Sequence, residues 1–328
     1  LDGLADAEGQ LIPLAVRQMW HGAAPIQRAS EIYALFAREA FARRPDAYIE
    51  TGWMTPVCAR PYATTFRYAD EVEDYLSPYP FGGFETHFDY AVWQTLLFGQ
   101  RPNMGANTGD PNRPDALTWL RGALALGAQA TLSFDLTRLS PERLVEYRAH
   151  LTHLRPFEGE TRFDAAVPPT TVAHVRGPLV YTGVINREDR ARTIRLDLAA
   201  LGLETGVPYT YYDVENRGFG QLTDGLAVSL PPRSFRLLVM RRTPGVLWTP
   251  SSFEETPEPG GLRVVLDGPP QVEGMAWLAS PPPAAVLLDG QPLAVGATPG
   301  YQYDAAHGVL QVRYAHNGPR TLEVRWPE

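Results

Sequence analysis

The pattern of apolar residues changes once along this 328-residue chain, near Pro168, and that change limits the fold more than any other feature. Before Pro168, short apolar segments alternate with longer stretches of helical period. After it, short β-type segments follow one another, separated by Gly, Pro, Asn and Asp turns. Alternating strands and helices are typical of parallel βα units, whereas closely spaced strands are typical of antiparallel sandwiches. We therefore expect an α/β region followed by all-β structure.

The α/β region contains four predicted helices that alternate with short predicted strands. In the second helix, Phe84, Phe88 and Ala91 recur at helical spacing and form one apolar face. The fourth helix begins with Ser140 as N-cap and Pro141 at its first position. The predicted helices cover residues 25–45, 84–99, 113–127 and 140–154, and the predicted strands cover residues 46–50, 62–70, 102–109 and 130–136.

Four βα units amount to half of an eight-fold barrel, whose full length is roughly 250 residues. We therefore predict that residues 1–164 form the C-terminal half of a (β/α)8 TIM barrel. Residues 165–242 predict an antiparallel β-sandwich, and residues 243–328 predict a second small all-β module. The expected fold class is thus α/β plus all-β, a half barrel followed by one or two antiparallel β-sandwich domains.

Composition excludes several classes of partner and cofactor. The net charge of −8 argues against binding to the phosphate backbone of nucleic acids, which needs clustered cations. No apolar stretch reaches the length of about 18 residues that a membrane span requires. The single cysteine, Cys58, and the isolated His21 and His87 lack partners at metal-ligand spacing, so we expect no metal and no other cofactor. The sequence leaves open the oligomeric state and the choice between cytoplasmic and secreted localisation.

Acidic residues stand at the ends of the predicted strands. Asp2, Glu50 and Asp70 end their segments, and Asp135 lies late in the last predicted strand. In a βα barrel the active-site groups lie at the C-terminal ends of the strands. Glycoside cleavage needs two carboxyl groups with opposed duties, which strand-end acids can supply. Position alone also allows a structural role for each of these acids, because acidic residues cap helices and solvate loops.

Three segments resemble the α-galactosidase and α-N-acetylgalactosaminidase clan of glycoside hydrolases, families 27 and 36. "LDGLAD" at residues 1–6 is similar to the clan's nucleophile segment, and "FRYADEVEDY" at residues 66–75 looks like its acid/base segment. "TLSFDLTRLSPERL" at residues 131–144 is similar to its last strand and helix. The order of the segments agrees, and "LGLETGVPYTYYDVE" at residues 201–215 is similar to the β domain that follows the barrel.

The resemblance implies a retaining α-glycosidase that acts on an oligosaccharide or glycoside through a covalent glycosyl-enzyme. Asp2 would be the nucleophile and Asp70 the general acid/base. Glu50 and Arg67 would contact the substrate, although Arg67 is one residue closer to Asp70 than in the clan. The residues after Glu50, "TGWM", depart from the clan's patterns, which leaves the galactose preference open. Trp53, in that segment, could stack on a sugar face or pack in the core.

Two alternative functions stay open at this point. A transglycosylase would use the same scaffold and the same covalent intermediate, and a non-catalytic carbohydrate-binding protein would account for the altered residues after Glu50. The resemblance also implies that the chain begins at the end of the fourth barrel strand. A half barrel exposes sheet edges and apolar surface, so we expect this chain alone to be unstable or inactive.

Overall fold

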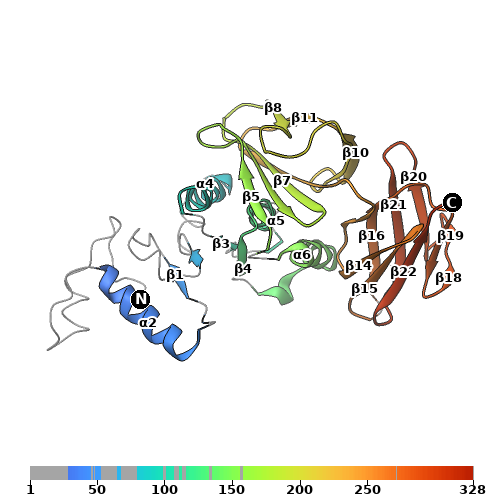
Figure 1. Ribbon diagram of the computed structural model, residues 1–328, viewed down its shortest axis with the longest axis horizontal. Helices are drawn as coiled ribbons and strands as arrows, with labels where there is room; N and C mark the ends of the chain where they lie inside the picture. The colour runs from blue at the N-terminus through green and yellow to red at the C-terminus, as the bar shows by residue number, and fades with distance from the viewer. Residues whose placement is uncertain are drawn as a thin grey trace. The chain divides into compact units, whose positions relative to one another are not determined.

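The computed structural model describes two compact units (Figure 1). One unit comprises Leu1–Asp110 and Ala128–Phe134, and the other Pro111–Gly127 and Asp135–Glu328. Among the described residues, no helix has the length and hydrophobicity that crossing a bilayer requires. The structure describes residues 29–45, 47, 49–52, 65–67, 80–98, 101–106, 111–112, 116–132, 135–155, 158–270 and 272–327.

The first unit contains a parallel sheet whose strands lie in sequence order, β1-β2-β3-β4. Its strands are β1 (Glu50–Gly52), β2 (Thr65–Arg67), β3 (Arg101–Ala106) and β4 (Gln129–Leu132), and its described helices are α2 (Ala29–Arg43) and α4 (Pro80–Phe98). Parallel neighbours need a crossover connection, and α4 supplies it between β2 and β3. The predicted succession of strands and helices is therefore confirmed for the described part of this unit.

Helix α4 contacts β3, and the apolar face that the sequence predicts is buried. Phe84, Phe88 and Ala91 are each at most 2% exposed, and the two phenyl rings lie 5.5 Å apart. The helix begins at Pro80, four residues before the start that periodicity predicts, because proline suits a first helical turn.

The helices of the second unit are α5 (Ala116–Leu126), the short 3₁₀ helix η2 (Leu136–Arg138) and α6 (Pro141–His153). The predicted cap of α6 is confirmed, because the Ser140 hydroxyl accepts a hydrogen bond from the Arg143 backbone N–H at 3.2 Å. Helix α5 is buried at nine of its residues and contacts α6, β6, β7 and β12. A helix that is apolar on nearly all sides needs such cover.

The first β-module of this unit is an antiparallel sandwich with a shared apolar core. Its larger sheet has the order β10-β9-β12-β7-β6-β5, and β11 pairs with β8 in the smaller sheet. β5 joins this sheet although it precedes residue 165, where the sequence predicts the sandwich to begin. The strands are β5 (Glu160–Phe163), β6 (Thr171–Arg176), β7 (Leu179–Asn186), β8 (Arg192–Asp197), β9 (Tyr209–Asp213), β10 (Gly218–Leu222), β11 (Gly225–Leu230) and β12 (Ser234–Arg241).

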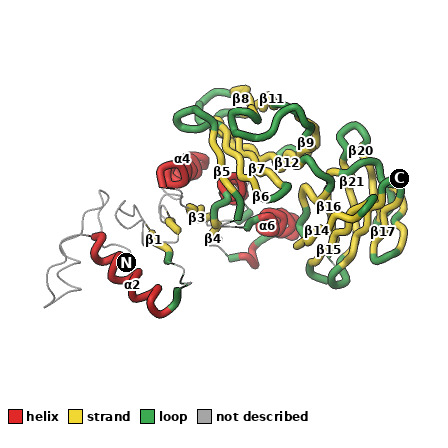
Figure 2. The backbone as a smooth tube through the Cα atoms, viewed as in Figure 1, coloured by secondary structure: helices red, strands yellow, loops and turns green. Residues whose placement is uncertain are grey.

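The second β-module packs two five-stranded sheets, β13-β16-β21-β20-β19 and β14-β15-β22-β17-β18, around its own core. Figure 2 shows that the described chain after α6 consists of strands and loops. The strands are β13 (Gly245–Trp248), β14 (Ser252–Glu258), β15 (Gly261–Asp267), β16 (Glu273–Ala279), β17 (Ala285–Leu288), β18 (Gln291–Pro292), β19 (Ala294–Val295), β20 (Gly300–Asp304), β21 (Val309–Ala315) and β22 (Arg320–Arg325).

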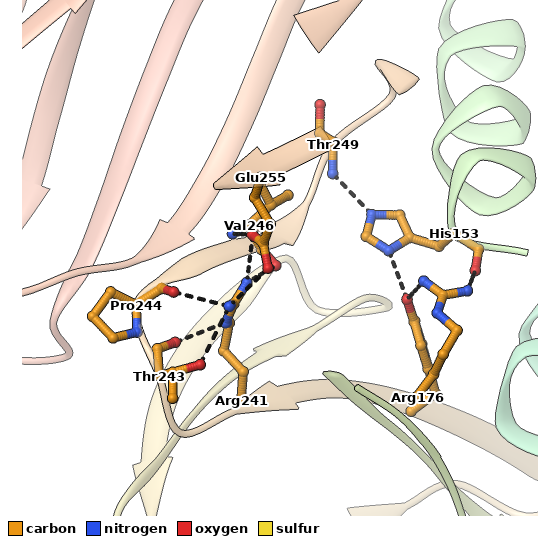
Figure 3. A network of polar contacts seen from close by, with 9 residues as sticks. His153, Arg176, Arg241, Thr243, Pro244, Val246, Thr249 and Glu255 are labelled. Atoms are coloured by element: carbon orange, nitrogen blue, oxygen red, sulfur yellow. Dashed lines mark hydrogen bonds and ion pairs between the residues drawn. The ribbon is translucent and has the colours of Figure 1, made fainter. Parts of the chain in front are cut away.

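A buried ion pair joins the two β-modules (Figure 3). Arg241, the last residue of β12, is 2% exposed. Its two terminal guanidinium nitrogens form a bidentate ion pair with the carboxylate oxygens of Glu255 in β14, at 2.9 and 3.0 Å. Its remaining N–H groups donate to the carbonyls of Thr243, Pro244 and Val246. All five guanidinium donors therefore have an acceptor, which offsets the cost of removing the charge from water.

His153, at the end of α6, connects this helix to both β-modules (Figure 3). Its Nε2 accepts the Thr249 backbone N–H at 3.3 Å, and its Nδ1 lies 3.0 Å from the Tyr181 hydroxyl. Because a backbone N–H only donates, Nε2 carries no proton, and Nδ1 must donate to Tyr181. The ring also stacks on Trp248, with the ring centroids 4.5 Å apart. Burial, with the Arg176 charge as a smaller cause, holds the pKa of His153 well below its usual value.

We predict that Gly183→Ala destabilises the protein by about 1–3 kcal/mol, the usual cost of overpacking a core. Gly183 lies in β7 under α5, and an added Cβ would lie 2.6 Å from the Phe235 ring and 2.9 Å from the Ala125 Cβ. Urea unfolding measures the loss. Gly218→Ala is the control, because no atom lies within 4 Å of a Cβ at that position. Equal stability of the two variants would contradict the close packing of α5 on β7.

We predict that acid weakens the folded state through His153. In the unfolded chain the imidazole takes up a proton below pH 6.5, its ordinary pKa, whereas the folded protein keeps it neutral. The unfolded state then binds more protons, so the free energy of unfolding falls as the pH drops below about 6.5. Between pH 7.5 and pH 5 this one group contributes a loss of about 2 kcal/mol.

The comparison protein for this measurement is His153→Gln, whose amide can make both hydrogen bonds and does not titrate. Urea unfolding at pH 7.5 and pH 5 should show a loss about 2 kcal/mol smaller in His153→Gln than in the unmodified chain. All other titratable groups are common to the two proteins, so their contributions cancel. An identical pH dependence in both would mean that His153 is protonated in the folded state.

Candidate functional site

In the parallel sheet β1–β4, the first two strands end level with each other. Gly52 of β1 pairs with Arg67 of β2, and Arg67 pairs with Asn103 of β3. The last residues of β1 and β2, Gly52 and Arg67, are therefore neighbours across the sheet. In βα folds this carboxyl edge is where catalytic and binding groups gather.

Three of the predicted site residues, Asp2, Trp53 and Asp70, lie outside the described residues. In the sequence, Trp53 directly follows the last residue of β1, and Asp70 comes three residues after the last residue of β2. Both therefore belong to segments that begin at the carboxyl edge of the sheet. Their roles, and that of Asp2, stay predictions.

The backbones of the other two predicted residues, Glu50 and Arg67, lie at opposite ends of the β1–β2 pair. Arg67 is the last residue of β2, at the carboxyl edge. Glu50 begins β1, opposite Thr65, so the prediction that a strand ends at Glu50 is wrong. The extent of β1 is set by its pairing with β2 and not by the apolar run that precedes Glu50. Glu50 therefore lies two residues, about 7 Å, back from the edge.

Asp135 is a capping residue and not the strand residue that the sequence predicts. β4 ends at Leu132, and the Asp135 carboxylate accepts hydrogen bonds from the backbone N–H and the hydroxyl of Thr137, at 3.0 and 2.7 Å. These bonds hold the pKa of Asp135 below its usual value. The alternative reading of a strand-end acid as a helix cap is therefore the correct one here.

Asn103 is a buried polar residue within β3, three residues before the end of that strand, and it is not among the residues that the sequence predicts for the site. It is 3% exposed and lies in β3, in register with Arg67 on one side and Gln129 of β4 on the other. Its signal in the sequence is an amide inside the otherwise apolar run "PNMGA". A buried amide can both donate and accept hydrogen bonds, which suits the binding of a hydroxylated ligand.

His87 of α4 is suited to packing and not to proton transfer near neutral pH. It is 8% exposed, and burial lowers its pKa to about 4, so the imidazole is neutral at pH 7. Within the described residues, no group of three or more His, Cys, Asp or Glu side chains is arranged to hold a metal ion. His21 and Cys58 lie outside those residues.

No protein-family model and no curated protein matches the sequence. Solved structures to which the chain is similar include a GH27 β-L-arabinopyranosidase from Geobacillus stearothermophilus, at 12% identity, with 66% of this chain and 55% of that enzyme covered and a TM-score of 0.47. Another is α-galactosidase I from Mortierella vinacea, at 11% identity, with 65% and 62% covered and a TM-score of 0.47.

A third is an isomalto-dextranase from Arthrobacter globiformis T6, complexed with panose. It matches at 14% identity, with 99% of this chain and 65% of that enzyme covered and a TM-score of 0.49. The chain spans less than two thirds of the length of each of these enzymes. The first two names belong to the group of enzymes that the sequence motifs resemble.

Proposed function

We propose that this chain carries part of the catalytic barrel of a retaining α-glycosidase, together with the β-modules that follow it. The observation that carries the proposal is the parallel order β1-β2-β3-β4, in which β1 and β2 end level with each other. The segments that contain Trp53 and Asp70 follow these two strands in the sequence. The motifs "LDGLAD" and "FRYADEVEDY" add the two carboxylates that such chemistry requires. The (β/α)8 barrel itself is part of this proposal.

In the proposed reaction, the ionised Asp2 carboxylate attacks the anomeric carbon while Asp70 donates its proton to the leaving oxygen. A covalent glycosyl-enzyme results, and the aglycone departs as an alcohol. Asp70, now ionised, takes a proton from water, which attacks the anomeric carbon and releases Asp2. Two inversions at one carbon give net retention. Arg67, the last residue of β2, and Asn103, which pairs with it in β3, are the proposed binding residues beside this pair.

We predict that Asp70→Asn lowers kcat for an aryl α-glycoside with a poor leaving group by about 10²–10⁴-fold, the usual contribution of general acid catalysis. For an aryl group that leaves without protonation, Asp70→Asn should not slow the first step, which is formation of the glycosyl-enzyme. Asp2→Asn should abolish turnover of both substrates, because no covalent intermediate can form. Asp135→Asn is the matched control, since the amide oxygen can still cap η2.

The stereochemistry of the first-formed sugar, followed by NMR, separates retention from inversion. Undiminished turnover in Asp70→Asn, or an inverted product, would overturn the two-carboxylate assignment. Transfer of the sugar to an added sugar acceptor in preference to water would identify a transglycosylase. Sugar binding without turnover in a protein that carries the whole barrel would leave the non-catalytic carbohydrate-binding function.

A further inference from the structure

A cavity of about 310 Å³ opens at the edge of the first β-module, where the β6–β7 turn, the loop after β8 and the end of β12 converge. Its volume is at the small end of the range for ligand pockets. The residues that line it lie between Arg162 and Thr243, so none of the residues proposed for catalysis contributes to it.

The floor of the cavity is apolar. Val180 and Leu203 are 4% and 8% exposed and belong to the core of the module. Beside them, Tyr209 is 3% exposed, and the guanidinium carbon of Arg242 lies 5.7 Å from the centre of its ring. An apolar floor with a few polar groups at its rim is the usual form of a small-molecule site.

The rim carries charges of both signs in close pairs. Arg242 forms an ion pair with Glu204, and each of these side chains is about half exposed. Arg162 donates to the Gly202 carbonyl at 2.5 Å and to the Glu160 carboxylate at 2.8 Å. Each guanidinium thus has a carboxylate beside it, and an incoming anion would meet those carboxylates as well as the arginines. A ligand with hydroxyl groups would find donors and acceptors side by side.

Tyr209 adds a phenol hydroxyl to the residues that line the cavity, and this group can both donate and accept hydrogen bonds. Burial raises the pKa of Tyr209, with the Arg162 charge opposing, and the hydroxyl therefore keeps the proton that it can donate.

We propose that this cavity binds one neutral sugar ring of an oligosaccharide, through the Tyr209 hydroxyl, the Glu204 carboxylate and the Arg242 guanidinium over an apolar floor. The carboxylate accepts and the guanidinium donates hydrogen bonds to adjacent sugar hydroxyls, while the C–H face of the ring packs on Val180 and Leu203. This site goes beyond the proposed hydrolysis, because it holds a glycan without reacting with it.

The test titrates the complete 328-residue chain with isomaltotriose and follows binding by saturation-transfer NMR. Tyr209→Phe and Glu204→Gln should each weaken binding about tenfold, which corresponds to about 1.4 kcal/mol. Tyr211→Phe is the matched control, a tyrosine of the same strand that does not line the cavity. Both test changes preserve side-chain size, and an unchanged thermal unfolding midpoint shows that each variant is folded.

Inorganic sulfate, titrated in the same way, distinguishes a sugar site from an anion site. Removing the Glu204 charge would strengthen sulfate binding and weaken sugar binding. The proposal is overturned if sulfate displaces the sugar, if Glu204→Gln binds isomaltotriose more tightly, if the unmodified chain does not bind it, or if Tyr209→Phe and Tyr211→Phe bind it equally.

The titration is repeated with Asp70→Asn to separate this proposal from the proposed hydrolysis. Persistence of Tyr209-dependent binding in Asp70→Asn is the expected result. If sugar binds through Tyr209 and Asp70→Asn leaves hydrolysis undiminished, the catalytic proposal alone fails. If it hydrolyses glycosides and Tyr209→Phe binds isomaltotriose as the unmodified chain does, the cavity proposal alone fails.

Discussion

The second unit depends on the burial of one charged group, the guanidinium of Arg241. A cation removed from water is tolerated only when every donor has an acceptor and the charge has a counter-ion. Glu255 of β14 provides the counter-ion. The carbonyls of the segment 243–246, which leads from β12 into β13, accept the remaining N–H groups. The connection between the two β-modules is therefore held in one conformation.

The same constraint explains a glycine in that connection. Gly245 has a φ of +145°, and a Cβ there would lie 2.2 Å from the Arg241 guanidinium. Only glycine leaves room for the buried cation and adopts this backbone geometry without strain. The Arg241 guanidinium thus depends on three features together. Glu255 balances its charge, the backbone carbonyls accept its remaining N–H groups, and Gly245 leaves room for it.

Aromatic side chains extend this contact and indicate what the second β-module does. Trp277 of β16 stacks on Tyr212 of β9, with ring centroids 5.2 Å apart, and Trp248 packs against Tyr212 and His153. Among the described residues of the second β-module, no aromatic side chain is prominently exposed. Trp248 and Trp277 contribute to contacts with the first β-module. Bracing of the first β-module is the role that these contacts support.

Local sequence signals determined the features that depend on neighbouring residues alone. The apolar face of α4, the Ser140–Pro141 start of α6 and the change to β structure after Pro168 all follow from periodicity, capping and turn chemistry, which act within a few residues. The resemblance of the motifs around Asp2 and Asp70 to a glycosidase clan is likewise a property of sequence. Tertiary structure decided the rest. The start of β1 at Glu50, the burial of Arg241 and the cavity beside Tyr209 depend on segments 14 or more residues away. Local sequence signals cannot specify these partners, because strand register and charge burial are settled only when distant segments pack together.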